Sequence, residues 1–170
     1  MPKTLTLSLP TATATELLGG ALARSLPQPQ TTGTVMYLRG ELGAGKTTCV
    51  RSFLRSLGAV GTVRSPTYTL LETYSLAPLI CVHVDLYRVR TEGEVEELGL
   101  RDLLDEEHLL LIEWPEKGGL AVPAADLELH LEYAGEGRLA ALAARSEGGD
   151  SWLTNLGRDN RLVPYVSNLT

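Results

Sequence analysis

Hydrophobic and polar positions alternate in two stretches of the chain, and each alternation predicts a strand with one buried face. In residues 4–9 leucines are separated by Thr or Ser, and in residues 126–133 apolar residues are separated by Glu or His. The run His108–Ile112 is instead almost continuously apolar, which is typical of a central strand buried on both faces. The pattern therefore predicts a sheet that combines half-exposed strands with a fully buried one.

Helical signals occupy other parts of the chain. A capping-box pair, Thr13 and Glu16, precedes apolar residues at helical spacing and predicts a helix that stops before Pro27. A second capping box opens the predicted helix Thr91–Leu98, and a shorter helical stretch, Arg101–Glu107, follows it.

Two further strands are predicted to form a hairpin. The runs Tyr68–Tyr74 and Leu79–Val84 both have strand character, and only residues 75–78 separate them. A parallel crossover needs a dozen or more residues, so this pair should be antiparallel. Residues 138–145 could form a returning strand or an Ala-rich helix, and periodicity does not distinguish between the two. We therefore predict an α/β fold with a mixed sheet.

The strongest chemical signal lies in residues 34–57. Gly40, Gly45, Lys46 and Thr47 fill the phosphate-loop pattern G-x-x-x-x-G-K-[ST]. A short apolar strand precedes the loop and apolar residues at helical spacing follow it, which is the order of elements that the motif requires. The predicted fold class is therefore α/β, a phosphate-loop NTPase-like three-layer sandwich with a mixed parallel/antiparallel central sheet.

The residue types of this loop suit a nucleotide phosphate. Glycines allow successive backbone N–H groups to point at one anion, and the following helix adds its N-terminal partial positive charge. Lys46 would contact the β- and γ-phosphates, and the hydroxyl of Thr47 could ligate Mg²⁺. The predicted nucleotide-binding residues of the loop are Gly43, Ala44, Gly45, Lys46, Thr47 and Thr48.

Two carboxylates are candidates to work beside the phosphates. Asp85 follows the predicted strand Leu79–Val84, and Glu113 follows His108–Ile112. Ligands of α/β sheets sit at the ends of such strands, and a bound Mg-nucleotide needs a carboxylate nearby. Glu113 follows the better central strand and is the better metal candidate, which leaves Asp85 to orient or deprotonate the attacking water. The sequence pattern alone does not decide between these roles.

Composition narrows the class of protein further. A chain of 170 residues with 44% hydrophobic and 21% charged residues suits a globular protein of one domain. Its net charge of −6 argues against an extended nucleic-acid-binding face. We expect neither a signal peptide nor a membrane span, and hence a cytoplasmic location. Residues 1–145 are predicted to form the phosphate-loop ATPase domain, and residues 146–170, rich in Gly, Ser and Asn, a peripheral C-terminal extension.

Four strings in this order resemble the bacterial TsaE family. They are GELGAGKTT (residues 40–48), SPTYTL (65–70), HVDLYR (83–88) and LIEWPE (111–116). The phosphate loop is generic, whereas the other three strings make the resemblance specific. That family is the ATPase required to form N6-threonylcarbamoyladenosine (t6A) at adenosine 37 of tRNA. The resemblance therefore implies a Mg²⁺-dependent ATPase.

The same resemblance implies roles for individual residues. Thr47 and Glu113 would be the magnesium ligands, Lys46 the phosphate contact, and Asp85 a group essential for hydrolysis. Lys46, Asp85 and Glu113 are thus the expected catalytic residues. Residues 65–67 would form a mobile loop that senses the nucleotide state.

The resemblance also implies ligands and partners. Arg138 matches a family position that touches the nucleotide, and Thr13 or Thr15 lies where the N-terminal segment approaches the base. The expected ligands are ATP and Mg²⁺. The expected partners are TsaD and TsaB, which carry out the threonylcarbamoyl transfer, with tRNA met indirectly through their complex.

Two other functions remain open on the sequence alone. A small-molecule or nucleoside kinase is compatible with the loop and the chain length, although the arginines that a kinase lid needs are few. A nucleotide-gated binding module without meaningful turnover is the other alternative. Among single residues, His83 is expected to be a satisfied histidine of the sheet, whereas Trp114 could cap the core or stack on a partner.

Overall fold

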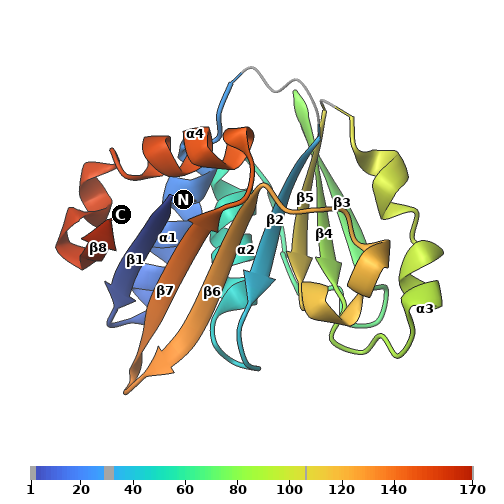
Figure 1. The fold of residues 1–170 in the computed structure, drawn as a ribbon, viewed down its shortest axis with the longest axis horizontal. Coiled ribbons are helices and arrows are strands. Elements are labelled where there is room, and N and C mark those ends of the chain that lie inside the picture. Colours follow the sequence, from blue (N-terminus) through green and yellow to red (C-terminus); the bar gives the residue numbers. More distant parts are fainter. Residues whose placement is uncertain (1–2, 29–32, 106, 170) are drawn as a thin grey trace.

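The computed structural model describes residues 3–28, 33–105 and 107–169. They form one eight-stranded sheet in the order β3-β4-β5-β2-β6-β7-β1-β8, flanked by helices (Figure 1). The strands are β1 (Thr4–Leu9), β2 (Thr34–Arg39), β3 (Leu71–Leu76), β4 (Leu79–Asp85), β5 (His108–Glu113), β6 (Leu127–Ala134), β7 (Gly137–Ala144) and β8 (Val166–Leu169). The helices are α1 (Ala12–Arg24), α2 (Lys46–Ser56), α3 (Glu92–Glu96) and α4 (Glu147–Leu156). Within the described ranges, no helix is both long and apolar enough to cross a membrane.

The sheet is mixed, as predicted. Strands β4, β5, β2 and β6 run parallel to one another, and antiparallel pairs extend the sheet at both ends. The predicted hairpin is present, since β3 pairs with β4 in antiparallel register. The predicted α/β class with a mixed central sheet is therefore confirmed.

Residues 137–144 form a strand, which settles the alternative that periodicity left open. Strand β7 pairs with β6 on one side and with β1 on the other. Its residues Ala140, Leu142 and Ala144 are buried against the core. Pairing on two sides together with this burial outweighs the helical preference of alanine, because strand formation depends strongly on context.

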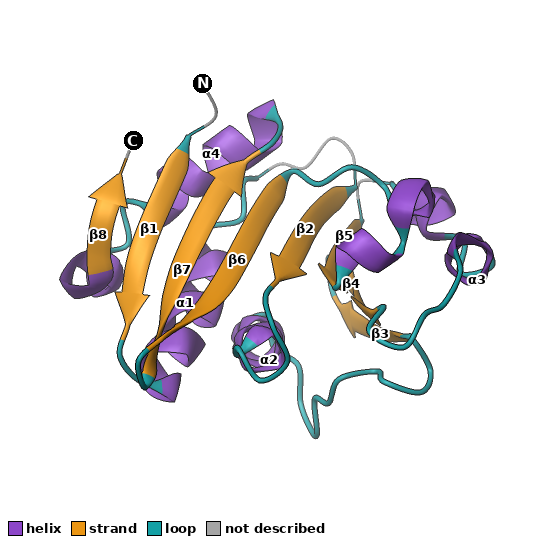
Figure 2. Ribbon diagram, turned by 60° about the horizontal axis from the view of Figure 1, so that its bottom comes forward, coloured by secondary structure: helices purple, strands orange, loops and turns teal. Residues whose placement is uncertain are grey.

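Helices cover the two faces of the sheet unequally. Helices α1 and α2 pack side by side on one face (Figures 1 and 2), and their buried residues share a core with Leu109 and Leu111 of β5. On the opposite face, Leu110 and Ile112 pack under Val95 of α3. Strand β5 is thus buried on both faces, which explains its continuous apolar sequence.

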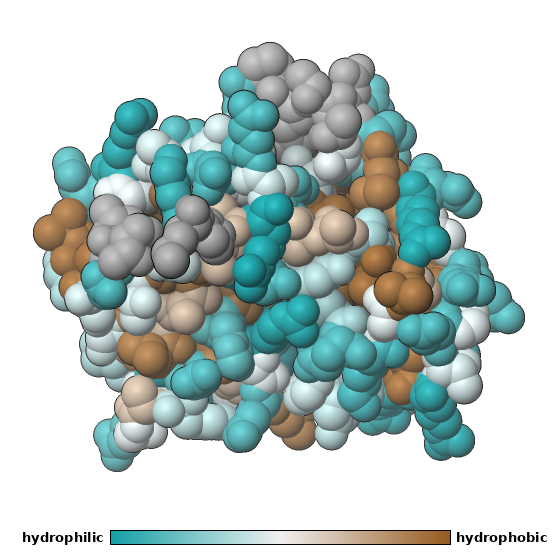
Figure 3. All heavy atoms as spheres, in the orientation of Figure 1, coloured by the Kyte–Doolittle hydropathy of each residue, from teal (hydrophilic) through white to brown (hydrophobic). Residues whose placement is uncertain are grey.

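The surface seen from the viewpoint of Figure 1 is mixed in character. In the described part of that face, hydrophobic residues occur in separate groups between polar ones (Figure 3). Apolar side chains on this face therefore do not form one continuous patch.

Helix α1 begins two residues earlier than predicted. Its N-cap is Thr11, which has an extended backbone and whose side chain accepts a hydrogen bond from the amide of Ala14. Thr13 lies inside the first turn, so the predicted capping box of Thr13 and Glu16 is wrong. An N-cap needs a non-helical backbone, and Thr11 provides it directly after Pro10.

Two other predicted elements are shorter in the structure. Strand β3 starts at Leu71 and not at Tyr68, because the amide of Leu70 donates to the carbonyl of Pro66 at 2.8 Å and closes a turn. The predicted helix Arg101–Glu107 is reduced to a 3₁₀ turn over Leu100–Leu103. One of its residues, at position 106, lies outside the described residues.

The C-terminal segment lies in the main core. Trp152 of α4 is 0% exposed, and its indole N–H donates to the carbonyl of Leu22 in α1 at 2.9 Å. Its ring centroid lies 6.3 Å from that of Phe53 in α2. Strand β8 then pairs with β1 at the edge of the sheet. The division of the chain at residue 145 stays a prediction, but "peripheral" does not describe this segment, because its apolar side chains share the core of the domain.

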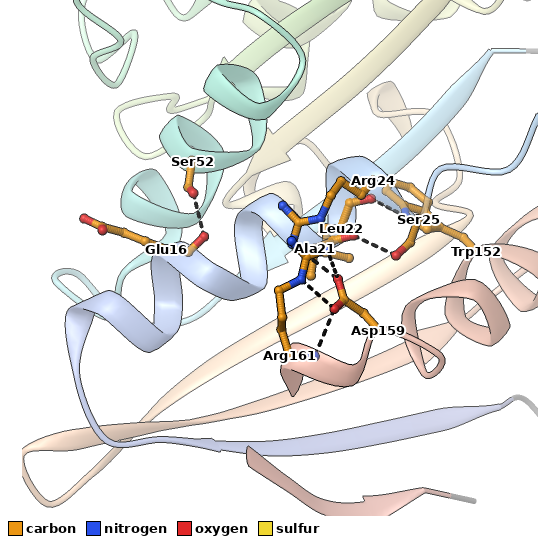
Figure 4. Close-up of polar contacts among 9 residues, drawn as sticks. All are labelled: Glu16, Ala21, Leu22, Arg24, Ser25, Ser52, Trp152, Asp159 and Arg161. Atoms are coloured by element: carbon orange, nitrogen blue, oxygen red, sulfur yellow. Dashed lines mark hydrogen bonds and ion pairs between the residues drawn. The ribbon is translucent and has the colours of Figure 1, made fainter. Parts of the chain in front are cut away.

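Asp159 fixes this segment to the end of α1 (Figure 4). Its carboxylate accepts hydrogen bonds from Arg161 at 2.8 and 3.0 Å and from Arg24 at 3.3 Å. It also accepts from the backbone amide of Arg161 at 3.1 Å and so caps a 3₁₀ turn. The hydrogen bonds from Arg161 are the main cause that lowers the pKa of Asp159 below its ordinary value of 3.8.

Replacing Asp159 by Asn should therefore remove a pH-dependent part of the stability. A carboxylate whose folded pKa is lowered stabilises the fold above its unfolded pKa, and this contribution is lost as the pH falls through the folded pKa. We expect Asp159→Asn to cost about 0.2–1 kcal/mol near neutral pH, the range for solvent-screened ion pairs. Urea unfolding of both proteins at several pH values should show this difference shrinking below about pH 4. Glu96→Gln, an exposed carboxylate of α3, is the control for losing one charge, and a difference independent of pH would contradict this role.

Candidate nucleotide-binding site

The phosphate loop lies where β2 ends and α2 begins. Gly40 has φ 138°, and a Cβ at this position would lie 2.3 Å from the carbonyl oxygen of Leu131 in β6. Gly45, the residue before α2, has φ 109° and makes no side-chain cap. Only glycine combines this backbone with such a close approach. An uncapped helix N-terminus behind a glycine loop can bind an anion through its amides.

Residues of β6 and β7 hold the loop from outside. Arg138 donates from Nε to the carbonyl of Ala44 at 3.0 Å and from Nη2 to the carbonyl of Gly43 at 3.1 Å. Its guanidinium lies 4.2 Å from the ring centroid of Tyr133, whose hydroxyl donates to the carbonyl of Leu42 at 2.8 Å. Three consecutive carbonyls of the loop are thus satisfied by side chains of one hairpin. A contact of Arg138 with the nucleotide itself stays a prediction.

The side chain of Lys46 is buried, and its ammonium is hydrogen-bonded to carbonyls of the phosphate loop. Its ammonium donates to the carbonyls of Gly40 at 2.5 Å and Glu41 at 2.9 Å and lies 4.3 Å from the ring centroid of Trp114. Burial lowers the pKa of Lys46, and the nearby carboxylates, Glu113 first, act in the opposite direction. The buried ammonium is largely removed from water, and its described hydrogen-bond partners are neutral carbonyls. Charged phosphate oxygens would bind it more strongly than these carbonyls do.

Glu113 and Thr47 form a direct contact. The Thr47 hydroxyl lies 3.0 Å from Oε1 and 3.3 Å from Oε2 of Glu113, although the two residues are 66 positions apart in the chain. The contact arises because β5 is the parallel neighbour of β2, so its end lies beside the start of α2. Glu113 is only 2% exposed, and its carboxylate also lies 2.8 Å from Nε2 of His83.

Asp85 lies beside Glu113 but has different partners. The two residues are in register on the parallel strands β4 and β5, so both carboxylates lie on the face that α2 covers. Asp85 accepts hydrogen bonds from the Ser65 hydroxyl and from the amide of Tyr87 at 2.9 Å. Glu113, and not Asp85, is therefore the carboxylate next to Thr47, whereas Asp85 joins the end of β4 to the loop at residues 65–67.

Two clefts open on either side of the loop. A cleft of about 410 Å³ is bounded by Lys46, Thr47, both carboxylates and Ser65. A second cleft of about 280 Å³ lies between the start of α1 and the β6–β7 turn. Both clefts share residues of the loop. An elongated ligand could therefore place phosphates in the first and a nucleoside in the second.

Of the two threonines predicted near the base, one borders the second cleft and the other does not. Thr15 lines it and is 3% exposed, whereas Thr13 is exposed and lies outside its lining. The lining includes Thr11, which the sequence interpretation missed, together with Arg138. The resemblance offered Thr13 and Thr15 as alternatives, and of these two Thr15 borders the cleft. The structure brings the neighbouring turn positions, Thr11 and Thr15, to the cleft.

The oxygen donors of the larger cleft fit a magnesium ion. Mg²⁺ takes oxygen ligands in octahedral geometry and usually keeps waters and phosphate oxygens beside one or two protein ligands. The Thr47 hydroxyl and the Glu113 carboxylate supply oxygens of this kind next to the phosphate loop. These two residues would hold the ion, and it would neutralise charge on the β- and γ-phosphates.

Sequence reasoning undervalued two residues of this site. The prediction that His83 is a histidine of the sheet is confirmed, but it did not include the contact of its ring with Glu113. Trp114 has φ 57° and lies over Lys46, with its ring centroid 5.0 Å from that of Tyr87. Both are within two residues of the predicted carboxylates, Asp85 and Glu113, and this proximity was the available signal.

Comparison with known proteins gives relatives that are described as TsaE. A protein-family model described as "Threonylcarbamoyl adenosine biosynthesis protein TsaE" matches residues 9–140. The tRNA threonylcarbamoyladenosine biosynthesis protein TsaE of Haemophilus influenzae is 40% identical over 134 residues, which cover 79% of this chain and 78% of that protein. The TsaE protein of Rickettsia felis is 36% identical and covers 74% of each chain.

A solved structure agrees with these sequence matches. The crystal structure of YdiB from Bacillus subtilis superimposes with a TM-score of 0.74 at 25% sequence identity and covers 93% of this chain and 97% of that chain. The family match thus covers the phosphate loop, both carboxylates and Arg138, and the structural match extends over most of the sheet. The chain belongs to the TsaE family of threonylcarbamoyl adenosine biosynthesis proteins.

Proposed function

We propose that this protein is a Mg²⁺-dependent ATPase that supports t6A formation at adenosine 37 of tRNA and acts with the TsaB–TsaD complex. The observation that carries the proposal is the contact between Thr47 and Glu113 at the mouth of the phosphate loop. It joins the predicted phosphate site and the predicted metal site in one cleft. The proposed function also implies a cytoplasmic location.

In the proposed mechanism, the loop and Lys46 bind the phosphates of ATP. The amides of the uncapped α2 terminus surround the β-phosphate, and the Lys46 ammonium moves from the Gly40 and Glu41 carbonyls to the phosphate oxygens. Thr47 and Glu113 would hold Mg²⁺, which would supply positive charge beside the phosphates. The adenosine occupies the second cleft beside Thr15 and Arg138.

Asp85 is the residue assigned to the attacking water. Its carboxylate borders the same cleft as Lys46 and is fixed by the Tyr87 amide on one oxygen and by Ser65 on the other. A carboxylate held in this way can accept a hydrogen bond from water and orient it toward the γ-phosphate.

Ser65 supports a link between hydrolysis and the partner proteins. It belongs to the predicted nucleotide-sensing loop, and its hydroxyl contacts Asp85 directly. Loss of the γ-phosphate and its water would change the surroundings of Asp85, and this change would reach the loop through Ser65. Such a loop can report the nucleotide state to a bound TsaB–TsaD complex.

The proposal is tested by measuring ATP hydrolysis by the purified protein, first with Mg²⁺ and then with a chelator. We expect slow hydrolysis only with Mg²⁺ and a changed rate once TsaB and TsaD are added. If these partners leave hydrolysis unchanged and t6A forms without this protein, the proposal is wrong. Labelled phosphate on an acceptor other than water would identify a kinase instead. If a variant at Asp85 or Glu113 cannot hydrolyse ATP but still supports the partner proteins, the protein is a nucleotide-gated binding module.

Nucleotide binding should change the fluorescence of Trp114. The Lys46 ammonium lies 4.3 Å from its ring, and in the proposed mechanism the ammonium leaves the ring for the phosphates. Such a cation–π contact is worth about 0.5–1 kcal/mol or more, so its loss alters the electrostatic environment of the indole. Titration with ADP should give a saturable change in emission. Trp114→Phe should bind ADP by calorimetry without this change, because the other tryptophan, Trp152, is buried in the core.

A further inference from the structure

His83 is a polar side chain in a position that otherwise suits an apolar one. It is 0% exposed and lies between Val82 and Val84 in β4. Its Nε2 lies 2.8 Å from Oε1 of Glu113, and among the described residues its Nδ1 has no hydrogen-bond partner. All the described hydrogen bonding of this buried ring is therefore directed at one carboxylate oxygen.

The contact follows from the register of the sheet. His83 and Asp85 are two positions apart in β4, so their side chains lie on the same face. Glu113 is in register with Asp85 on the neighbouring parallel strand. The His83 ring thus lies one step behind the two carboxylates, on the side of the core and away from the strand ends.

A space-filling role alone does not account for this histidine. Burying a polar group without a hydrogen-bond partner destabilises a fold, and Nδ1 has no partner among the described residues. An aliphatic side chain would fill the same space without that cost. The feature that an aliphatic residue could not reproduce is the hydrogen bond to Glu113.

We propose that His83 is a positioning residue that orients the Glu113 carboxylate for the metal ion of the nucleotide site. The inference rests on the proposed function, because it assigns Glu113 to Mg²⁺. His83 donates from Nε2–H to Oε1, and Oε1 also accepts from the Thr47 hydroxyl at 3.0 Å. Among the described residues, Oε2 has only the longer contact with Thr47, at 3.3 Å, and is therefore the oxygen with capacity left for a metal.

This role requires one tautomer of the ring. Glu113 as a carboxylate only accepts hydrogen bonds, so His83 must carry its proton on Nε2. Nδ1 has no partner among the described residues, so the hydrogen bond to Glu113 is the contact that orients the ring. Partners of this kind, which contact a metal ligand and not the metal, fix the ligand's orientation, and their removal weakens metal affinity by about 10- to 100-fold.

Two amide substitutions provide a matched test. The amide nitrogen of Gln is as many bonds from Cβ as the Nε2 of His, whereas that of Asn corresponds to Nδ1. His83→Gln can restore the donor to Glu113, and His83→Asn, equally polar, cannot reach it. His83→Leu removes the donor and keeps an apolar side chain of similar size.

The readout is Mn²⁺ binding in the presence of ADP, followed by electron paramagnetic resonance, so that hydrolysis is not involved. We expect His83→Leu and His83→Asn to weaken Mn²⁺ binding by about 10- to 100-fold, and His83→Gln by less than about threefold. The affinity for ADP without metal should be the same in all four proteins, because the phosphate loop is untouched. Equal loss of metal-free ADP affinity would indicate a folding defect and would overturn the positioning role.

Two outcomes separate this inference from the proposed function. If wild-type protein with ADP binds no Mn²⁺, the metal site itself is wrong and the inference falls with it. If the wild type binds Mn²⁺ and all three variants match it, only the inference is overturned. Nitrogen-15 NMR of the histidines is a further test, since a proton on Nδ1 in place of Nε2 would exclude the hydrogen bond to Glu113.

Discussion

Replacing Asp85 by Asn should lower ATP turnover by about 10²–10⁴-fold, the usual contribution of a positioned acid or base. The affinity for Mg-ATP should change little, because Asp85 contacts neither Thr47 nor the phosphate-loop carbonyls in the structure. Asn has the same shape, so its oxygen can still accept from the Tyr87 amide and its nitrogen can donate to Ser65. The substitution therefore removes the negative charge and leaves the local backbone in place.

Single-turnover hydrolysis and equilibrium binding measured on the same preparation would test this prediction. Ser65→Ala is the control, because it removes one hydrogen bond to Asp85 and keeps the carboxylate. We expect it to reduce turnover far less than Asp85→Asn. Wild-type turnover in Asp85→Asn would show that another group orients the water. Loss of binding in parallel with turnover would place Asp85 in the binding site.

Replacing Lys46 by Met should reduce ATP affinity and turnover together, by about 10²–10³-fold for the chemical step alone. Its ammonium is the charged side-chain donor that the phosphate loop itself supplies to the larger cleft. The loss should not arise from unfolding. Burial lowers the pKa of Lys46, so the charged form is disfavoured in the fold, and an unbranched apolar residue should be tolerated.

Calorimetry with ADP and a urea unfolding curve would separate these effects. The expected result is a greatly weakened affinity for ADP with an unchanged or raised free energy of unfolding. Lys46→Arg keeps the positive charge and is the control for it, with a planar guanidinium in place of a compact ammonium. If Lys46→Met binds ADP as the wild type does, the loop does not hold phosphates in the way proposed.

The sequence predicted most of the local structure around the site. The pattern at Gly40–Thr47 fixed the strand, loop and helix, because glycine conformations and helix initiation depend on neighbouring residues. The link between β3 and β4 is too short for a parallel crossover, so the two strands had to form a hairpin. The continuous apolar run of β5 indicated burial on both faces. Errors occurred where local signals competed, as with Thr11 and Thr13 at the start of α1.

The sequence did not predict how distant segments meet. The C-terminal segment was described as peripheral because of its Gly, Ser and Asn content, yet Trp152 lies in the core against Leu22 and Phe53. A contact of Arg138 with the nucleotide stays a prediction, whereas its hydrogen bonds to carbonyls of the phosphate loop and of its own turn were not predicted. Such contacts depend on strand order and packing, and the local periodicity of a sequence carries no information about either.

The sequence by itself determined that this chain has a phosphate loop and two carboxylates at strand ends, since each feature depends on a few adjacent residues. Only the tertiary structure decided which carboxylate contacts Thr47 and which contacts Ser65. The order β4-β5-β2 places Glu113 against Thr47 and leaves Asp85 with Ser65. The same order brings the buried ring of His83 to Glu113, because parallel strands in register align side chains that are far apart in the chain.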